Sequence, residues 1–322
     1  MHYATRPDMI TKDDIAAARK RIRPHVHETP VLTSTRLGNA VGVLLHLKCE
    51  SMQRTGSFKA RGALNAMMQL SAAEKAMGVV TVSAGNHAQS LAWAASLVGA
   101  NSVACMPEGA SSSKVAATEG YGGKVELVPG EKIRAFERAN EIAATGRVMV
   151  HPFEDARVAA GAGTVALELL EQVPDLEAII VPIGGGGLIA GIAVAAKSIK
   201  PGIQIIGVEP EGAPTMKAAL DAGAPQTISP KTVADGLAAP MVGAMTLEVV
   251  KRYVDGLVLV TDEEILSAMR DLLTYAKLVT EPAGAAAVAA LLSGKAKFTA
   301  GAKVAAILSG GNVDLDRLKI LL

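Results

Sequence analysis

The sequence has few aromatic residues and no excess of charge. Four phenylalanines, four tyrosines and one tryptophan are spread over 322 residues, so base stacking on aromatic side chains is excluded as the main mode of binding. The 32 lysines and arginines balance 31 aspartates and glutamates, which leaves a formal net charge of +1. Such a chain has no global electrostatic attraction to nucleic acid or to an anionic membrane.

Cysteine is nearly absent as well. Cys49 and Cys105 lie in apolar runs, without CxxC spacing and without a histidine at ligand spacing. They are predicted to be buried thiols in a reducing compartment. The polar, charged N-terminus does not have the pattern of a signal peptide. These features predict a cytoplasmic protein.

One charge-free segment has the length of a membrane-spanning helix, but it is interrupted. The 19 residues from 178 to 196 contain no charged side chain, yet Pro182 and four consecutive glycines lie within them. In a helix interior a proline costs ~3 kcal/mol and each glycine about 1 kcal/mol. The segment is therefore predicted to form a strand, a glycine turn and a helix, and no membrane partner is expected.

The sequence is rich in one repeated unit: a β-branched run, a turn of small residues and an alanine-rich helical stretch. Helical patterns separate short strands predicted at 79–82, 102–106, 124–128, 178–183, 203–208 and 303–308. Apolar strands that alternate with helices form parallel sheets covered on both faces. The sequence therefore predicts an α/β fold with ligands beyond the carboxyl ends of the strands, where the small-residue turns fall.

The first candidate site is the glycine segment 184–188, which opens a predicted helix. Glycines there let backbone N–H groups approach an anion at the positive end of the helix, which favours a phosphate. Gly185, Gly187 and Ala190 also satisfy the GxGxxA spacing of a dinucleotide site, and Glu209 ends the next strand. The segment alone leaves a phosphate cofactor, a dinucleotide and a plain tight turn open.

Three further turns carry reactive or polar side chains. Lys59 follows Phe58 in GSFKARG, a setting that suits either a buried amine able to form a Schiff base or a surface lysine. Ser83–His87 ends another strand and suits either a bound carboxylate and ring oxygen or an ordinary helix N-cap. Ser309 follows the last strand, where its hydroxyl suits either a heterocycle nitrogen or a plain turn. Each turn alone leaves both interpretations open.

Seven segments, taken in order, carry a resemblance to one family from about Ile10 to Leu315. They are KCESMQRTGSFKARGALN, SAGNHAQ, HPFED, GAGTVALEL, VPIGGGGLIAGIAVA, TEPAGA and LSGGNVDL. By these motifs the chain resembles the threonine/serine dehydratase and serine racemase family of pyridoxal-phosphate enzymes, and most of all its single-domain threonine dehydratases.

The resemblance implies the tryptophan-synthase-β-like fold, known as fold type II. This fold has two domains, each an open, twisted, mostly parallel sheet flanked by helices. Residues 1–66 and 151–322 would form a large cofactor-binding domain, and residues 67–150 a small, mobile substrate-binding domain. The family also implies a homodimer or homotetramer.

The same resemblance implies how pyridoxal 5'-phosphate would be bound. Lys59 would hold it through a Schiff base, with Phe58 beside the ring. Asn86 would contact the ring hydroxyl, and Ser309 would face the ring nitrogen. The phosphate would be held by Gly184, Gly185, Gly186, Gly187 and Leu188.

A small amino-acid substrate is implied as the partner. Phe153 would form an apolar wall for its β-substituent. Glu281 in TEPAGA resembles a carboxylate near the ring, although it equally suits the first turn of a helix. The substrate carboxylate would be bound by Ser83, Ala84, Gly85, Asn86 and His87.

The implied reaction is β-elimination of water from L-threonine or L-serine, which gives a 2-oxo acid and ammonia. A neutral Ser309 hydroxyl leaves the ring a weaker electron sink than an aspartate would, and this favours prompt loss of a β-leaving group. Dehydration of hydroxyaspartate or of a bulkier 3-substituted serine is an alternative. An enzyme of another class, a nicotinamide-dependent oxidoreductase, is the alternative that the GxGxxA spacing suggests.

Two departures from the family pattern bear on the activity. Similar racemases have a serine where this chain has Ala84, and because a methyl group cannot carry a proton, serine racemisation is disfavoured. A divalent cation site of the family would use Glu209 and Ala213, but Thr215 stands where its third ligand, an aspartate, is expected. A monovalent or divalent cation is therefore left open, with no metal site assigned.

Overall fold

Two separate sheets organise the residues that this computed structural model describes, 9–130 and 132–322. The larger sheet has the strand order β1-β2-β10-β7-β8-β9, and the smaller has the order β5-β4-β3-β6. Every pairing is parallel except that of β1 with β2. The predicted α/β fold with two mostly parallel sheets is confirmed.

The larger sheet is covered by helices on both faces. Its strands are β1 (Val31–Thr33), β2 (Leu44–Lys48), β7 (Ala178–Pro182), β8 (Gln204–Pro210), β9 (Gly256–Val260) and β10 (Lys303–Ile307). One face packs on α1 (Lys12–Ile22), α8 (Ala156–Gln172), α9 (Gly187–Ile199), α10 (Thr215–Ala222) and α11 (Ala244–Tyr253). The other face packs on α2 (Thr35–Val41), α12 (Asp262–Asp271) and α13 (Pro282–Leu292).

The side-chain alternation of a strand produces these two cores. In β7, Ile179 and Val181 point into the first core, whereas Ala178 and Ile180 point into the second. Successive residues of a strand face opposite sides of the sheet, so a strand buried on both faces is apolar throughout. This explains why the sequence pattern of the central strands is a continuous apolar run.

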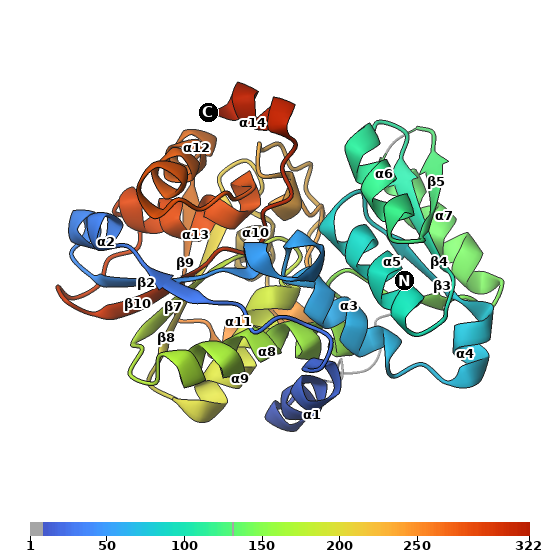
Figure 1. Cartoon of the computed structure of the whole chain (residues 1–322), viewed down its shortest axis with the longest axis horizontal. Coiled ribbons are helices and arrows are strands. Elements are labelled where there is room, and N and C mark those ends of the chain that lie inside the picture. The colour runs from blue at the N-terminus through green and yellow to red at the C-terminus, as the bar shows by residue number, and fades with distance from the viewer. Residues whose placement is uncertain (1–8, 131) are drawn as a thin grey trace.

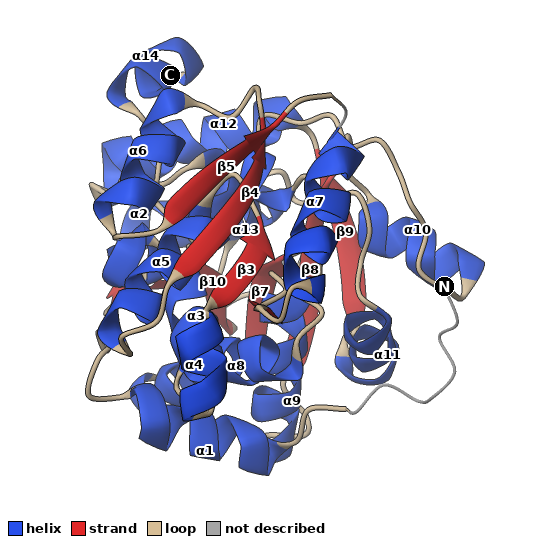
Figure 2. Cartoon of the chain, turned by 90° about the vertical axis from the view of Figure 1, so that its right-hand side faces the viewer, coloured by secondary structure: helices blue, strands red, loops and turns tan. Residues whose placement is uncertain are grey.

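The smaller sheet consists of β3 (Val79–Val82), β4 (Ser102–Pro107), β5 (Lys124–Val128) and β6 (Val148–Met149). Its helices are α4 (Ala72–Met77), α5 (Asn86–Leu97), α6 (Ser112–Gly120) and α7 (Lys132–Ala144), and α3 (Lys59–Met67) packs between α5 and α8. Figure 1 shows this group as a small lobe beside the large lobe, with α3 between them, and Figure 2 shows its strands in front of the larger sheet. The predicted domain limits, 1–66 with 151–322 and 67–150, stay a prediction, and residues 1–8, which bear on them and on the predicted absence of a signal peptide, lie outside the described residues.

Short irregular elements complete the chain. They are the 3₁₀ turns η1 (Glu50–Met52), η2 (Arg54–Gly56) and η3 (Asp235–Leu237), the π-helical turn η4 (Leu272–Ala276) and the last helix, α14 (Leu315–Leu321). In η2, Thr55 has a φ of 59°, which is rare for a β-branched residue and marks local strain just before Lys59.

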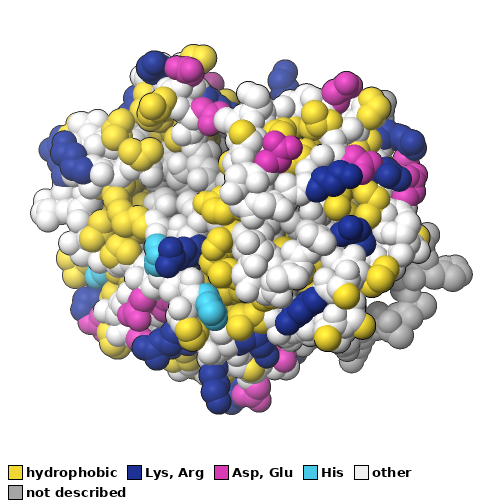
Figure 3. Space-filling model, turned by 45° about the vertical axis from the view of Figure 1, so that its right-hand side comes forward, with side chains coloured by type: hydrophobic (Ala, Val, Ile, Leu, Met, Phe, Trp, Pro, Cys, Tyr) yellow, Lys and Arg dark blue, Asp and Glu magenta, His cyan; other side chains and the backbone are white. Residues whose placement is uncertain are grey.

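The charge-free segment folds as predicted. It forms β7, a glycine turn and α9, and no helix among residues 9–130 and 132–322 is long and apolar enough to cross a membrane. Cys49 and Cys105 are free, buried thiols, and burial raises the pKa of each to about 11. Basic and acidic side chains are interspersed on the face seen in Figure 3. This mixture fits the near-zero net charge.

Candidate active site

The candidate segments meet where the carboxyl ends of strands from both sheets come together. Ser57 and Gly310 form an isolated antiparallel bridge, and the Phe58 N–H donates to the Ser309 carbonyl at 3.1 Å. Asn86 joins them from the small lobe, because Asn312 Nδ2 donates to Asn86 Oδ1 at 2.8 Å. The chain segments that begin at residues 57, 86 and 309 therefore meet at one site.

Lys59 is the first residue of α3, and its side chain is partly buried. Its Nζ donates to the Pro152 carbonyl at 2.8 Å and lies 5.1 Å from the centre of the Phe58 ring. Burial lowers the pKa of Lys59 to about 8, because the charged form loses hydration. A substantial part of the amine is then neutral near physiological pH, as a nucleophile requires.

A buried ion-pair network fixes the helix that carries Lys59. Arg61, on α3, donates to Glu50 Oε2 at 2.8 Å and to Glu168 Oε1 at 2.6 Å. Lys48 Nζ also donates to Glu168, at 3.0 Å, and all four side chains are buried. Because removing one partner would leave a buried charge unpaired, the network holds the start of α3 in one place.

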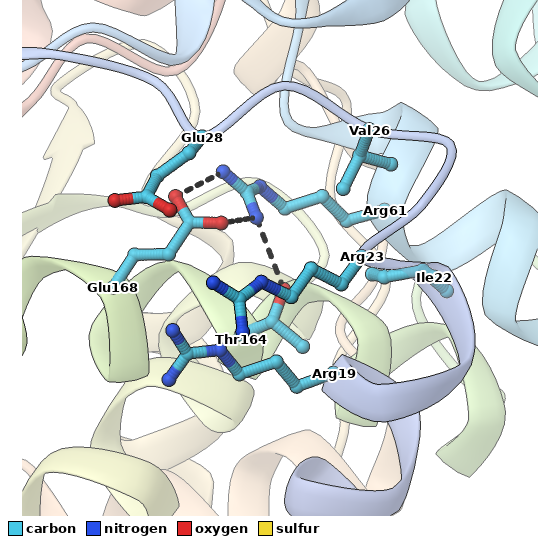
Figure 4. A pocket seen from close by; sticks show the side chains of 8 residues that line it. All are labelled: Arg19, Ile22, Arg23, Val26, Glu28, Arg61, Thr164 and Glu168. Carbon is cyan, nitrogen blue, oxygen red and sulfur yellow. Dashed lines mark hydrogen bonds and ion pairs between the residues drawn. The ribbon is translucent and has the colours of Figure 1, made fainter.

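A small pocket adjoins this network but contains none of the predicted site residues. Its volume is about 140 Å³, and Figure 4 shows Arg61, Glu168 and Thr164 joined by hydrogen bonds beside Arg19 and Arg23. Arg19 is itself paired with Glu171. Because none of the predicted site residues lines it, this pocket is not the candidate active site.

The glycine loop follows β7, and its backbone touches neighbouring residues too closely for any larger side chain. A Cβ at Gly185 would lie 2.2 Å from the Phe153 ring, and one at Gly186, where φ is 93°, would lie 2.8 Å from Thr246. Gly186 is the N-cap of α9, and no side chain caps this helix. The first N–H groups of α9 are therefore open to an anion.

Phe153 packs against the glycine loop. Its ring is buried, packs edge-on against the His151 ring at 4.5 Å and approaches the backbone of Gly185 and Gly187. The predicted role of Phe153 as an apolar wall for substrate stays a prediction. Its contact with the glycine loop is an additional role that the sequence did not indicate.

Asn86, which is partly buried, and the buried Glu281 form a polar contact between the lobes. Asn86 Nδ2 donates to Glu281 Oε1 at 2.6 Å, and Asn312 Nδ2 also donates to the Thr55 carbonyl at 2.7 Å. Burial, followed by the nearby Asp235 charge, raises the pKa of Glu281 to about 7. Glu281 is the N-cap residue of α13 but makes no side-chain capping bond, so it lies at the start of a helix and also contacts Asn86; its place near a cofactor ring stays a prediction.

Two hydroxyls lie beside this contact. Ser309 is buried, and its Oγ donates to the Ala283 carbonyl at 3.3 Å. Ser57 Oγ is also buried and has no hydrogen-bond partner in the described part of the chain. A buried hydroxyl without a partner is uncommon, and it fits a position that a bound polar group completes.

The segment Ser83–His87 leads from β3 into the first turn of α5, and Ala84 in it is partly buried. Gly85 is the N-cap of α5, again without a side-chain cap, so the first N–H groups of α5 are open to a carboxylate. His87 is turned away: its Nε2 lies 3.2 Å from the Val150 carbonyl. Burial and the Lys59 charge lower the pKa of His87 to about 3, so its ring is neutral and cannot attract a carboxylate by charge.

Glu209 and Ala213, the residues considered for a cation, are engaged in the start of α10. Glu209 is buried and accepts hydrogen bonds from the N–H groups of Met216 and Lys217 at 2.6 and 2.9 Å. The Ala213 carbonyl accepts from the Thr215 N–H at 3.0 Å. The described residues contain no group of three or more His, Cys, Asp or Glu side chains that could hold a metal. A ribose contact of a dinucleotide site needs an accessible carboxylate, whereas the Glu209 side chain is fully buried against the start of α10.

Three contributors were missed by sequence reasoning. Thr246 Oγ1 donates to the Gly185 carbonyl at 3.0 Å, and Glu154 accepts from the Met245 N–H at 3.0 Å, so α11 is tied to the glycine loop. The Pro152 carbonyl holds Lys59. HPFED, already conspicuous as a motif, contains two of these residues, whereas nothing in the sequence around Thr246 marks it.

Comparisons with known proteins agree with this geometry. A family model described as "Pyridoxal-phosphate dependent enzyme" matches residues 22–310. An L-threonine ammonia-lyase of Thermotoga maritima is 45% identical, with 96% of this chain and 77% of the relative covered. A serine racemase of Arabidopsis thaliana is 44% identical, with 94% of this chain and 93% of the relative covered. The structure of maize serine racemase superposes with a TM-score of 0.92 at 41% identity, over 97% of this chain and 96% of that one.

Proposed function

Because the chain belongs to the pyridoxal-phosphate-dependent enzymes, we propose that it dehydrates L-threonine or L-serine. β-Elimination of water, followed by hydrolysis, gives a 2-oxo acid and ammonia. One observation carries the proposal. The partly buried Lys59, whose pKa is lowered to about 8, contacts Pro152, and the neighbouring Phe153 packs on the glycine loop at the start of α9.

The residues present fit pyridoxal phosphate. A cradle of four glycines opens an uncapped helix, and the buried Ser57 hydroxyl has no described partner. Lys59 would bind the cofactor covalently beside Phe58, residues 184–188 would hold the phosphate, Asn86 the ring hydroxyl and Ser309 the ring nitrogen. When bound, the cofactor supplies the electron sink that makes the substrate Cα–H acidic.

The chain's own residues then bind, orient and move protons. Lys59 would take the Cα proton of the substrate, and its lowered pKa makes it a suitable base near neutral pH. Asn86 keeps one orientation because Glu281 and Asn312 both bond to it. The open N–H groups at the start of α5 receive the substrate carboxylate.

Racemisation of serine is the main competing activity, since a serine racemase is about as similar to this chain as the ammonia-lyase. Racemisation needs a proton carrier on the face of Cα opposite to Lys59. Position 84, next to Gly85 and Asn86, carries a methyl group, so this face lacks a donor from the residue that the motif marks. Ala84 therefore favours dehydration over racemisation. Hydroxyaspartate and bulkier 3-substituted serines are further substrates to test.

A substrate panel tests the proposal. Release of 2-oxo acid is measured with L-threonine, L-serine, hydroxyaspartate and a 3-substituted serine, and the unreacted serine is analysed for its D-isomer. We expect 2-oxo acid from threonine or serine and little D-serine. No turnover of any β-hydroxy amino acid, or racemisation faster than elimination, would overturn the assignment.

We also propose a domain motion, a cellular location and an oligomeric state for this enzyme. Residues 67–150 would move as the substrate-binding domain against residues 1–66 and 151–322, and the enzyme would work in the cytoplasm as a homodimer or homotetramer. The two buried free thiols support a reducing compartment. Light scattering coupled to gel filtration tests the assembly, and a monomer at enzyme-assay concentrations would contradict it.

A further inference from the structure

Asp235 is held from two sides by basic residues that are far apart in the sequence. Lys114, on α6 of the small lobe, forms an ion pair with Asp235 Oδ2. Arg317, on α14, forms a second ion pair with the same oxygen at 3.1 Å and donates to the Val233 carbonyl at 3.0 Å. One carboxylate therefore joins the small lobe, η3 and the last helix.

A second contact joins the same two helices. Ser113 Oγ, next to Lys114, donates to Asp314 Oδ2 at 2.6 Å, and Asp314 is the N-cap of α14. In Figures 1 and 2, α6 and α14 both lie toward the upper end of the molecule. The small lobe thus contacts the N-cap of α14 directly through Ser113, and it is joined to α14 indirectly because Lys114 and Arg317 share Asp235.

Asp235 also begins the turn that supports the candidate site. A Cβ built at Gly184 would lie 3.2 Å from Leu237 Cα and 3.3 Å from the Gly236 carbonyl oxygen. A Cβ at Gly236 would lie 2.9 Å from Ala283 and 3.7 Å from Glu281 Oε1. The turn η3 therefore packs against both the glycine loop and Glu281, so displacement of Asp235 displaces parts of the site.

We infer that Lys114 and Arg317 are positioning residues that clamp Asp235: Arg317 keeps η3 in place, and Lys114 fastens the small lobe over the site. Arg317 and Asp235 both belong to the large lobe, so their pair persists when the lobes separate. The pair of Lys114 with Asp235 crosses between lobes and must break for them to open. The side chains of Lys114 and Asp235 are 25% and 35% exposed, and a pair this exposed is weak enough to break in each cycle.

The test compares Lys114→Ala, Lys114→Arg and Arg317→Ala in the holoenzyme, with Lys319→Ala as the matched control. Lys319 lies on α14, as Arg317 does, and within the described residues its ammonium pairs with the exposed Asp316 alone. Hydrogen exchange is measured at residues 112–120 and 233–237, together with KM and kcat for the best substrate. The inference uses the proposed function only for the kinetic arm, because hydrogen exchange requires no turnover.

We expect Lys114→Ala to raise the exchange rate at residues 112–120 and to raise KM, each by roughly three- to fivefold, while kcat changes less than twofold. Lys114→Arg should behave like the wild type. Arg317→Ala should raise exchange at 233–237 as well. Unchanged exchange at 112–120 in Lys114→Ala, or an equal change in Lys319→Ala, would overturn the clamp. If exchange rises as expected but no amino acid is turned over, the clamp stands and the proposed dehydratase activity fails.

Discussion

Asn86 and Glu281 are 195 residues apart in the chain, yet Asn86 Nδ2 and Glu281 Oε1 are joined by a 2.6 Å hydrogen bond. Asn86 begins a helix of the small lobe, and Glu281 precedes a helix of the large lobe. The orientation of Asn86 is thus set by the other lobe. Any change in the charge or position of Glu281 acts directly on the residue proposed to contact the cofactor ring hydroxyl.

Replacing Glu281 with glutamine tests the cost of its charge. Burial raises the pKa of Glu281 from 4.5 to about 7 on folding. The stability that its neutral carboxyl contributes is therefore complete below pH 4.5, and it is lost as the pH rises through 7. Between pH 5 and pH 8 the wild type should lose roughly 2–3 kcal/mol of stability from this group. Glu281→Gln keeps an oxygen acceptor for Asn86 and should not show this loss.

Urea unfolding at pH 5 and pH 8 measures the difference. Glu119→Gln, at an exposed position, serves as the control and should follow the wild type. If Glu281→Gln and the wild type lose stability in parallel, Glu281 does not carry the buried charge.

The rate at which Lys59 of the apoenzyme binds pyridoxal phosphate should follow the neutral fraction of its amine. With a pKa of about 8, the rate should rise about tenfold per pH unit below pH 8 and level off above it. Stopped-flow absorbance of Schiff-base formation is the measurement, and Lys59→Ala should give no signal. A rate that keeps rising to pH 10, as for an ordinary lysine, would contradict the lowered pKa.

Gly185→Ala should weaken cofactor binding. The new methyl group would lie 2.2 Å from the Phe153 ring, and overpacking of this kind costs about 1–3 kcal/mol, which corresponds to roughly five- to 150-fold in affinity. Fluorescence titration of the apoenzyme with pyridoxal phosphate measures it. Gly202→Ala is the matched control because no atom lies within 4 Å of its new methyl group. Equal affinities in the two variants would refute a tight glycine cradle.

Ala84→Ser should introduce serine racemisation. A hydroxyl at this position would supply the proton carrier that Ala84 lacks, and general acid–base groups contribute about 10²–10⁴-fold, so D-serine formation should rise at least tenfold. Chiral chromatography of serine after incubation measures D-serine, with Ala224→Ser, at an exposed position, as the control. No gain in D-serine would show that position 84 does not face Cα.

Local patterns in the sequence predicted the interior strands well. Runs such as 79–82 and 178–182 are β-branched or apolar throughout, because both faces of these strands are buried. Four strands were missed: β1, β2, β6 and β9. The strands β1 and β6 have only three and two residues, and β9 is mostly half-buried, so their sequences carry little periodic signal and their pairing depends on neighbours distant in the chain.

The candidate site likewise has parts that a local sequence pattern predicted and parts that depend on residues distant in the chain. The motifs around Lys59, Asn86, the glycine loop and Ser309 identified segments that the structure places together. The contact of Thr246 with Gly185 joins residues 61 positions apart, and that of Lys114 with Asp235 joins residues 121 positions apart. Neither contact has a local pattern, because each arises only when elements distant in the sequence pack together in three dimensions. The site roles themselves stay predictions until the variants above are measured.

The place of β10 in the larger sheet has a consequence for synthesis on the ribosome. This strand is the last in sequence, Lys303–Ile307, yet it lies between β2 and β7, both of which are synthesised far earlier. Until residue 307 leaves the exit tunnel, β2 and β7 have no common neighbour and expose unpaired edges that invite association with other chains. The small sheet, complete at residue 149, can form long before, so the nascent chain passes through a stage with one finished lobe and one open one.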